Sequence, residues 1–327
     1  MKKLFGIFCL CFMMLTGIKT YAQTTQIATL FHDGTVTNFR SSTALSQALE
    51  AAAEGDVITL SSGMFQACEI NKNVTLRGAG MGYAQLGGTS APTLISGDFT
   101  INCPESETQA LYLEGLMVND RLTIKKADKM TALKCEFRAI YYSVEKWDDL
   151  KFIHCIINDI KVADECTLNI VNSVVKYFNL ELKSGQIVQF ENSVVYCKNY
   201  IEHTNLMNSV VFFQEDHTPA NNGNVVRSSS SSNHSIFVGI RTFSGSGSGN
   251  KFVGLEKAGE VFASDGFYEL AGEYKEFKGT DGNEVGIHGG SLPFSPVTTN
   301  LKISKFKVAE RTTSDGKLPV EINIESN

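Results

Sequence analysis

Apolar and polar positions alternate in a pattern that recurs at steps of 16 to 20 residues between residues 114 and 213. Each copy contains a small residue, with apolar residues five and three positions before it and more polar residues between them. The small residues are Gly115, Cys135, Cys155, Ser173, Ser193 and Ser209, and the apolar pairs are Met130/Ala132, Leu150/Phe152, Leu168/Ile170 and Val188/Phe190. Because side chains alternate across a strand, the apolar pairs are expected to face a core. Repetition near this length predicts a solenoid of stacked coils.

A second apolar column follows the small residues, which predicts another strand on a different side of each coil. Its members are Phe137, Ile157, Val175, Val195 and Val211. Asn172, Asn192 and Asn208 occupy the bend between the two strands. We expect these amides to stack and to hydrogen-bond to one another along the axis, as in other stacked-strand assemblies.

The two ends of the chain carry different patterns. Residues 26–31 and 35–39 flank Asp33-Gly34, which favours a tight hairpin turn. Leu45, Ala48, Leu49 and Ala52 then follow helical spacing and predict an amphipathic helix that covers the open end of the first coil. Residues 301–308 and 318–324 predict a C-terminal β-hairpin tail.

Two segments resemble a known superfamily. Residues 55–65, with residues 70–80, resemble the opening coil of secreted right-handed parallel β-helix proteins of the pectin-lyase-like superfamily. Residues 279–290, followed by Pro293-Phe294, resemble their closing segment, especially in proteins exported by Bacteroidetes. The resemblance implies an all-β fold, a single-stranded right-handed parallel β-helix, and leaves the activity open.

The domain organisation that we predict has four parts. They are a signal peptide at 1–22, a hairpin and capping helix at 23–56, the β-helix at 57–295 and the hairpin tail at 296–327. The first part combines a basic start, an apolar run from Leu4 to Leu15 and Ala22 before Gln23, as in a secretory signal. Cleavage near Ala22-Gln23 would place the mature protein in a secreted, periplasmic or outer-surface location. No later apolar run approaches the length of a transmembrane helix.

Charge and cysteine content narrow the possible partners. The formal net charge is −6, and nucleic-acid binding requires a basic face, so we expect no nucleic-acid partner. Six of the eight cysteines follow the signal segment. We interpret most of them as small buried residues, because free cysteine behaves as a small apolar side chain. The protein is expected to be a monomer.

Enzymes of the resembling superfamily act on pectins and other polysaccharides. A resembling polygalacturonase would need three clustered Asp together with Asn-Thr-Asp, Gly-His-Gly and Arg-Ile-Lys motifs. This chain has an Asp148-Asp149 pair, and its His288 lies in Gly-Ile-His-Gly-Gly. We therefore assign no catalytic residue and favour a non-catalytic protein. A polysaccharide lyase or glycoside hydrolase with an unrecognised site is the alternative.

One bend gathers acidic residues from consecutive coils. Asp148, Asp149, Asp164 and Glu165 are expected near one another, with lysines among them. Oxygen clusters of this kind bind calcium, which is the cofactor that this site would hold. The simpler interpretation, which we favour, is a solvated bend of mixed charge.

An outward column gives the candidate binding surface. It consists of Arg138, Asn158, Lys176, Tyr196 and Phe212. Its aromatic end offers amphipathic stacking area for sugars, and Trp147 at a neighbouring bend is a further candidate. We predict binding of a glycan or a cell-surface component along this face. For Tyr196 and Phe212 the simpler interpretation, which we favour, is that the Ser- and Gly-rich insertions fold back and cover the rings. The remaining alternative is that the solenoid is an adhesion or scaffold module.

Overall fold

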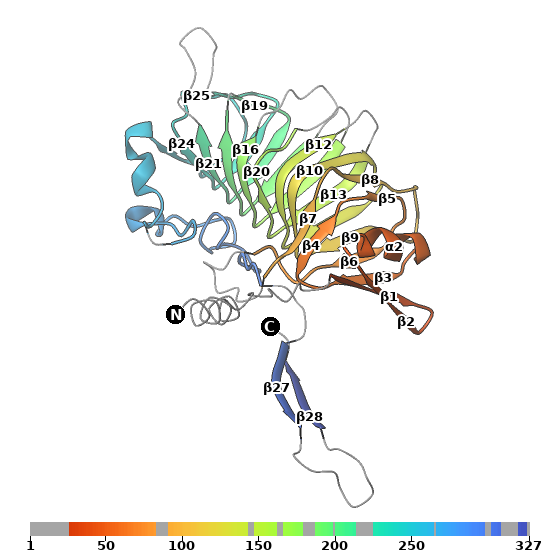
Figure 1. The fold of residues 1–327 in the computed structure, drawn as a ribbon. Helices are drawn as coiled ribbons and strands as arrows, with labels where there is room; N and C mark the ends of the chain where they lie inside the picture. Colours follow the sequence, from red (N-terminus) through yellow and green to blue (C-terminus); the bar gives the residue numbers. More distant parts are fainter. Residues whose placement is uncertain are drawn as a thin grey trace, which may run out of the picture.

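The computed structural model describes residues 26–82, 91–142, 147–161, 166–178, 187–198, 200–213, 225–264, 266–297, 302–308 and 320–325. The predicted signal peptide lies outside these ranges. Within them the chain winds as a right-handed parallel β-helix, whose strands stack side by side along one axis (Figure 1). None of the helices in these ranges has the length and apolar composition to cross a membrane.

Each coil contributes one strand to sheet A, which has eleven strands. In spatial order they are β2 (Thr35–Arg40), β1 (Ile27–His32), β3 (Val57–Leu60), β6 (Thr75–Arg77), β9 (Leu111–Glu114), β11 (Met130–Leu133), β13 (Trp147–Ile153), β15 (Cys166–Val171), β17 (Ile187–Glu191), β20 (Thr204–Met207) and β23 (Ser231–Asn233). From β3 onward neighbouring strands pair in parallel, with Met130 opposite Leu150 and Ala132 opposite Phe152. This register places equivalent residues of successive coils directly beside one another.

The next side of each coil belongs to the twelve-stranded sheet B. Its main path is β26 (Lys251–Val253), β24 (Ile236–Val238), β21 (Val210–Phe213), β18 (Val194–Cys197), β16 (Val174–Phe178), β14 (Ile156–Ile157), β12 (Glu136–Tyr142), β10 (Leu116–Lys126), β7 (Thr93–Ser96) and β4 (Gly63–Gln66), and β8 (Phe99–Asn102) and β5 (Glu69–Ile70) pair alongside. A third side is formed in the later coils by sheet C, with β19 (Tyr200–Ile201), β22 (Val225–Val226) and β25 (Thr242–Phe243).

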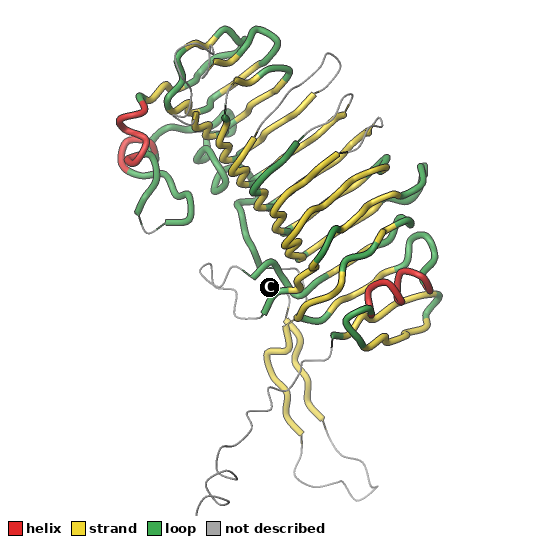
Figure 2. The backbone as a smooth tube through the Cα atoms, turned by 45° about the horizontal axis from the view of Figure 1, so that its top comes forward, coloured by secondary structure: helices red, strands yellow, loops and turns green. Residues whose placement is uncertain are grey.

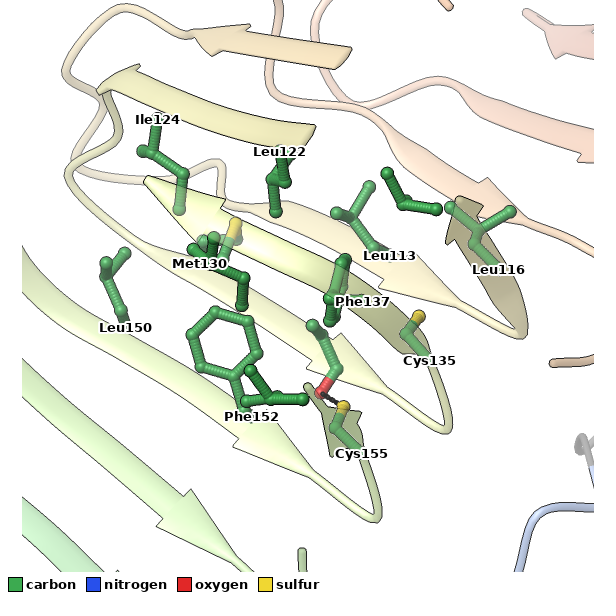
Figure 3. Close-up of a cluster of buried hydrophobic side chains, with 14 of the residues drawn as sticks. Leu113, Leu116, Leu122, Ile124, Met130, Cys135, Phe137, Leu150, Phe152 and Cys155 are labelled. Carbon is green, nitrogen blue, oxygen red and sulfur yellow. Dashed lines mark hydrogen bonds between the residues drawn. The ribbon is translucent and has the colours of Figure 1, made fainter. Parts of the chain in front are cut away.

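The predicted inward columns form the core. Leu113, Met130, Leu150, Phe137 and Phe152 are buried and lie together between the sheets (Figure 3). The Phe137 and Phe152 rings meet edge to face, with centroids 5.7 Å apart. The alternation of apolar and polar residues therefore assigned the inward side of these strands correctly.

The cysteines whose side chains are described are free, as predicted. Cys103, Cys135, Cys155 and Cys197 are buried, and Cys68 is partly buried. Burial raises the pKa of the Cys155 thiol to about 12, and its Sγ donates to the Ala132 carbonyl at 3.4 Å (Figure 3). The side chain of Cys166 lies outside the described part.

The axial hydrogen-bond ladder is made by serines and not by the asparagines that we predicted. The backbone N–H of Ser173 donates to Ser193 Oγ, and that of Ser193 donates to Ser209 Oγ, both at 3.2 Å. Each hydroxyl in turn donates to a carbonyl two residues earlier, as Ser193 does to Glu191. A hydroxyl fits this interior position because it can both accept from one coil and donate within its own coil.

The bend before each small residue has a left-handed backbone conformation. We call these residues the bend ladder: Lys134, His154, Asn172, Asn192, Asn208 and His234, with φ between +43° and +53°. Asn and His are among the residues that tolerate this conformation best. The repeated asparagines therefore allow the chain to turn from sheet A to sheet B.

The N-terminal cap has the predicted form. Asp33 and Gly34 both have positive φ in the turn between β1 and β2. Helix α2 (Ala44–Ala51) buries Leu45 and Leu49 against the first coil. Lys72 Nζ donates to the carbonyls of Leu49, Glu50 and Ala52 and so satisfies the exposed carbonyl end of this helix.

The last solenoid strand is β26, earlier than the predicted end of the β-helix at residue 295. Residues 254–297, which we call the strap, contain two short 3-10 helices, η2 (Leu255–Glu260) and η3 (Gly272–Tyr274). The strap leaves the last coil and runs back along sheet B toward the N-terminal coils (Figure 1). The C-terminal hairpin, β27 (Lys302–Val308) and β28 (Val320–Glu325), then projects from the solenoid (Figure 2).

Candidate functional site

The strap is held by side chains of the bend ladder. His154 Nε2 donates to the Leu292 carbonyl at 2.9 Å, and Asn172 Nδ2 donates to the carbonyls of Ile287 and Gly289 at 3.1 and 2.8 Å. Further along the solenoid axis, Asn208 Oδ1 accepts from the Thr280 backbone N–H at 2.8 Å, and His234 Nδ1 donates to the Lys278 carbonyl at 3.0 Å. The asparagines and histidines therefore bind the strap, coil by coil, in the reverse order of the chain.

An apolar layer lies between the strap and the outer face of sheet B. Ile156, Val174, Val194, Val210 and Ile236 form one outward column, and all five are buried. The strap covers them with Val261, Leu270, Tyr274, Val285, Ile287 and Phe294. Burial of apolar surface on the outside of the sheet is therefore a second source of stability, separate from the solenoid core.

The predicted binding column is divided by this layer. Tyr196 and Phe212 stack with centroids 4.9 Å apart and planes 17° apart, as a platform for sugars would. However, Phe212 is only 8% exposed, and Phe262 and Tyr268 of the strap pack on the pair. The two rings therefore pack under a covering segment, as the interpretation that we favour expects. In the described part of the chain the segment that packs on them is the strap, whereas we expected the Ser- and Gly-rich insertions.

The polar end of the column lies beyond this cover. Arg138 is exposed, and Asn158 and Lys176 are partly exposed. Glu136 lies beside them: burial raises the pKa of its carboxyl, whereas the charge of Lys176 and a hydrogen bond from Asn158 lower it. This end of the column combines a guanidinium, an ammonium and an amide, which are donors suited to carboxylate or hydroxyl groups.

Tyrosines and cations alternate on the adjoining side of the solenoid. Arg121 lies 4.6 Å and Lys161 5.0 Å from the centre of the Tyr141 ring, so this ring has a cation from another coil on either side. Two further pairs follow: Lys198 over Tyr177 at 5.6 Å and Arg227 over Tyr200 at 4.0 Å. We call these seven residues the tyrosine–cation strip. Ring and cation attract each other through the ring quadrupole, which orders both groups at the surface.

The predicted calcium site falls largely outside the described part of the chain. This applies to Asp164, Glu165 and the side chain of Asp148. Asp149 is described; it has φ +55° and forms an ion pair with Lys151 at 3.0 Å. In the residues that can be described, no group of three or more His, Cys, Asp or Glu is arranged to hold a metal ion.

Trp147, the remaining predicted binding residue, is placed only by its backbone. It begins β13 and pairs with Cys166 of β15. Its side chain lies outside the described part, so its role in binding stays a prediction.

A buried carboxylate in sheet A was not identified from the sequence. Glu114 is 1% exposed, and its Oε2 atom lies 3.3 Å from Arg77 Nε of the preceding coil. Burial, with a further contribution from the negative charge of Glu114, raises the pKa of Tyr112 to about 12. Burial lowers the pKa of Lys134, against the opposing effect of Glu114. Three coils thus bring four ionisable groups together at the corner between sheets A and B.

The sequence contains signals for both the strap and this cluster. Val174, Val194 and Val210 occupy outward positions, where an uncovered strand would carry polar residues, so they indicated a covering segment. Glu114 pairs with Leu133 of the next coil, and Leu133 pairs in turn with Ile153, so Glu114 occupies a position that is apolar in the two coils that follow. This acidic residue at an apolar position of the repeat indicates the ionisable cluster.

No protein-family model and no curated protein matches this chain. A solved structure titled "Glycoside hydrolase" is similar, at 10% sequence identity and a TM-score of 0.26. The similarity covers 60% of this chain and 38% of that chain. A likeness this weak supports no conclusion about activity, because unrelated functions share the same folds.

Proposed function

We propose that the mature protein is exported and binds an acidic glycan at its lateral surface without catalysing a reaction. The surface consists of the tyrosine–cation strip and the polar end of the predicted column, Arg138, Asn158 and Lys176. The observation that carries the proposal is the Tyr141 ring, which lies between Arg121 at 4.6 Å and Lys161 at 5.0 Å.

The chemistry of this surface suits an anionic sugar polymer. Tyrosine rings stack on the apolar faces of sugars, and their hydroxyls form hydrogen bonds. Arginine and lysine bind carboxylate and sulfate groups through charge-assisted hydrogen bonds. Parallel strands repeat at about 4.8 Å, so the coils present these groups at regular intervals along one direction. A linear polymer with charges at intervals fits such an arrangement.

Two carboxylates near the strip already have partners, whereas the buried Oδ1 atom of Asp159, two residues before Lys161, accepts no hydrogen bond from the described part of the chain. Asp120 Oδ2 accepts from the Gly97 backbone N–H at 2.7 Å, and Glu202 Oε2 accepts from Arg227 at 2.8 Å. Arg121 and Lys161 are exposed. Their charges are therefore available to a ligand in solution.

The test measures binding of the chain from Gln23 to immobilised polygalacturonate, heparin and dextran. We expect binding to the two acidic polymers and not to dextran, with affinity that falls as salt increases. The Arg121→Gln/Lys161→Gln double variant and the Tyr141→Ala variant should each weaken binding about tenfold, equivalent to about 1.4 kcal/mol. Lys151→Gln, which removes a partly exposed cation from sheet A, is the matched control and should bind normally.

Two results would contradict the proposal. If the strip variants bind as tightly as the wild type, the ligand lies elsewhere. If no glycan binds, the adhesion or scaffold function takes precedence, with the solenoid acting mainly as a spacer.

A polysaccharide lyase or glycoside hydrolase is the second candidate, and the cluster around Glu114 favours it. Groups with shifted pKa values gathered at one place are typical of catalytic sites, although structural ion pairs shift pKa values too. Incubation of the wild type with the same polymers, followed by detection of shortened or unsaturated products, tests this function. Turnover that is lost in Glu114→Gln and Tyr112→Phe would favour it over simple binding.

A further inference from the structure

The two ends of the solenoid differ in how their cores are covered. The hairpin β1–β2 and helix α2 close the N-terminal end. At the other end, Phe252 is the last member of the inward column that includes Val211 and Phe237, yet it is 54% exposed. Its ring stacks on Phe237 at 5.8 Å and contacts Phe243 edge to face at 5.6 Å. A terminal repeat without a polar cap exposes its core in this way.

The open end also has an unpaired strand edge. Strand β26 is the outermost strand of sheet B and pairs with β24 on one side. The strap does not fold under this edge; it turns away along the side of the solenoid (Figure 2). Unpaired N–H and C=O groups at a sheet edge accept an additional strand, and proteins commonly use such edges for recognition.

In the C-terminal hairpin, the apolar positions of both strands share one face of the ribbon. In its register Phe306 lies opposite Ile322 and Val308 opposite Val320. Because residues alternate across a strand, one face of the ribbon holds the apolar positions Ile303, Phe306, Val308, Val320, Ile322 and Ile324. The polar positions Lys305, Lys307, Glu321 and Asn323 share the other face. A two-stranded ribbon is marginally stable alone, and these two strands form a sheet of their own.

The strap places these two surfaces at opposite ends of one chain. It carries the hairpin back to the N-terminal coils, whereas Phe252 and β26 lie at the far end (Figures 1 and 2). Charge also matches between them. The hairpin carries Lys302, Lys305 and Lys307 on β27 and Glu321 and Glu325 on β28. The strap beside the open end exposes more acids than bases: Glu256, Glu260, Glu269, Glu273 and Glu276 against Lys257, Lys275 and Lys278.

We propose that the hairpin of one chain caps the open end of a second copy. Strands β27 and β28 continue sheet B beyond β26, and their apolar face covers Phe252. The contact joins different surfaces of the two copies, so repetition gives a linear, head-to-tail assembly and not a closed dimer. This assembly goes beyond the proposed glycan binding and differs from the monomer expected from the sequence. Several lateral surfaces in a row would strengthen binding to a polymer by avidity.

The test separates the two halves of the contact. One variant, Phe252→Lys, keeps the hairpin but places a charge on the open end. A second chain, which stops at Val297, keeps the open end but lacks the hairpin. Light scattering should show assemblies of the wild type that lengthen with concentration, whereas each altered chain stays monomeric. An equimolar mixture of the two altered chains should form a discrete dimer.

Controls and contrary outcomes follow from the same design. Met207→Lys changes an apolar residue on sheet A that is 37% exposed and should assemble like the wild type. If Phe252→Lys fails to fold by circular dichroism, Phe252→Gln replaces it, and Phe306→Asp/Ile322→Asp checks the hairpin without truncation. A wild type that stays monomeric, with protected hairpin amides, would mean that the hairpin docks on its own chain and would overturn the proposal. Assembly by the chain ending at Val297, or a mixture that yields no dimer, would also overturn it.

Discussion

Asn208 and Thr280 are joined across the surface of the solenoid by a hydrogen bond of 2.8 Å between Asn208 Oδ1 and the Thr280 backbone N–H. Asn208 has φ +51°, so it also forms the left-handed bend between sheets A and B. Its own carbonyl accepts a further hydrogen bond from the Gly286 N–H at 2.7 Å. One residue therefore turns the chain and holds the strap.

Substitution of Asn208 can separate these two roles. Asn208→Gly keeps a residue that tolerates positive φ but removes the side-chain bonds to Thr280, which should cost about 1–2 kcal/mol of unfolding free energy. Asn208→Ala removes the same bonds and adds the cost of a left-handed alanine, about 1–2 kcal/mol more. Urea unfolding and hydrogen exchange at residues 278–292 measure both effects.

The control for this pair is Asn205→Ala, which removes an exposed amide whose Oδ1 accepts from the Ser231 hydroxyl at 2.8 Å. It should change stability little. Equal stability of Asn208→Gly and the wild type would show that the side chain does not hold the strap.

Removal of the covered rings tests whether they belong to a core. Phe212→Ala should lower the unfolding free energy by about 3–5 kcal/mol, because the ring is buried under the strap and its removal leaves a cavity. Tyr196→Ala should also destabilise, and both variants should speed hydrogen exchange in residues 255–294. Phe31→Ala, at an aromatic residue that is 43% exposed, is the comparison and should cost far less. An unchanged melting temperature with reduced glycan retention would restore the two rings as a binding platform.

His154 should make the strap sensitive to acid. Burial lowers the pKa of this imidazole below its usual 6.5, and the charge of Lys134 lowers it further. The unfolded chain therefore takes up a proton near pH 6.5 while the folded chain resists it, so stability falls as the pH drops below about 6.5. The melting temperature of His154→Gln should consequently depend less on pH between 7.5 and 5 than that of the wild type.

His32 should change stability with pH in the opposite direction to His154. A hydrogen bond to Asp56 raises its pKa, so its stabilising contribution is complete below pH 6.5 and disappears as the pH rises through the raised value. His32→Gln should therefore lose stability mainly at the acidic end. A pH profile of His154→Gln identical to that of the wild type would argue against the inferred role of His154.

The sequence by itself determined the solenoid. Met130, Phe152 and Phe137 follow an alternation with a period of two, and this signal is local, because neighbouring side chains on a strand point to opposite sides. Repetition then stacks equivalent residues, so the small-residue column could also be assigned. The capping helix followed from the spacing of Leu45 and Leu49 for the same reason.

Only the tertiary structure decided which outward residues are exposed. Asn172 and Asn208 looked like an internal ladder, but their partners lie 115 and 72 residues away in the strap, and local sequence pattern contains no information about such contacts. The same long-range packing divides the predicted column, covering Phe212 and leaving Arg138 in solvent. A side chain's position on a strand is fixed by its neighbours in sequence, whereas its exposure depends on any segment that returns to cover it.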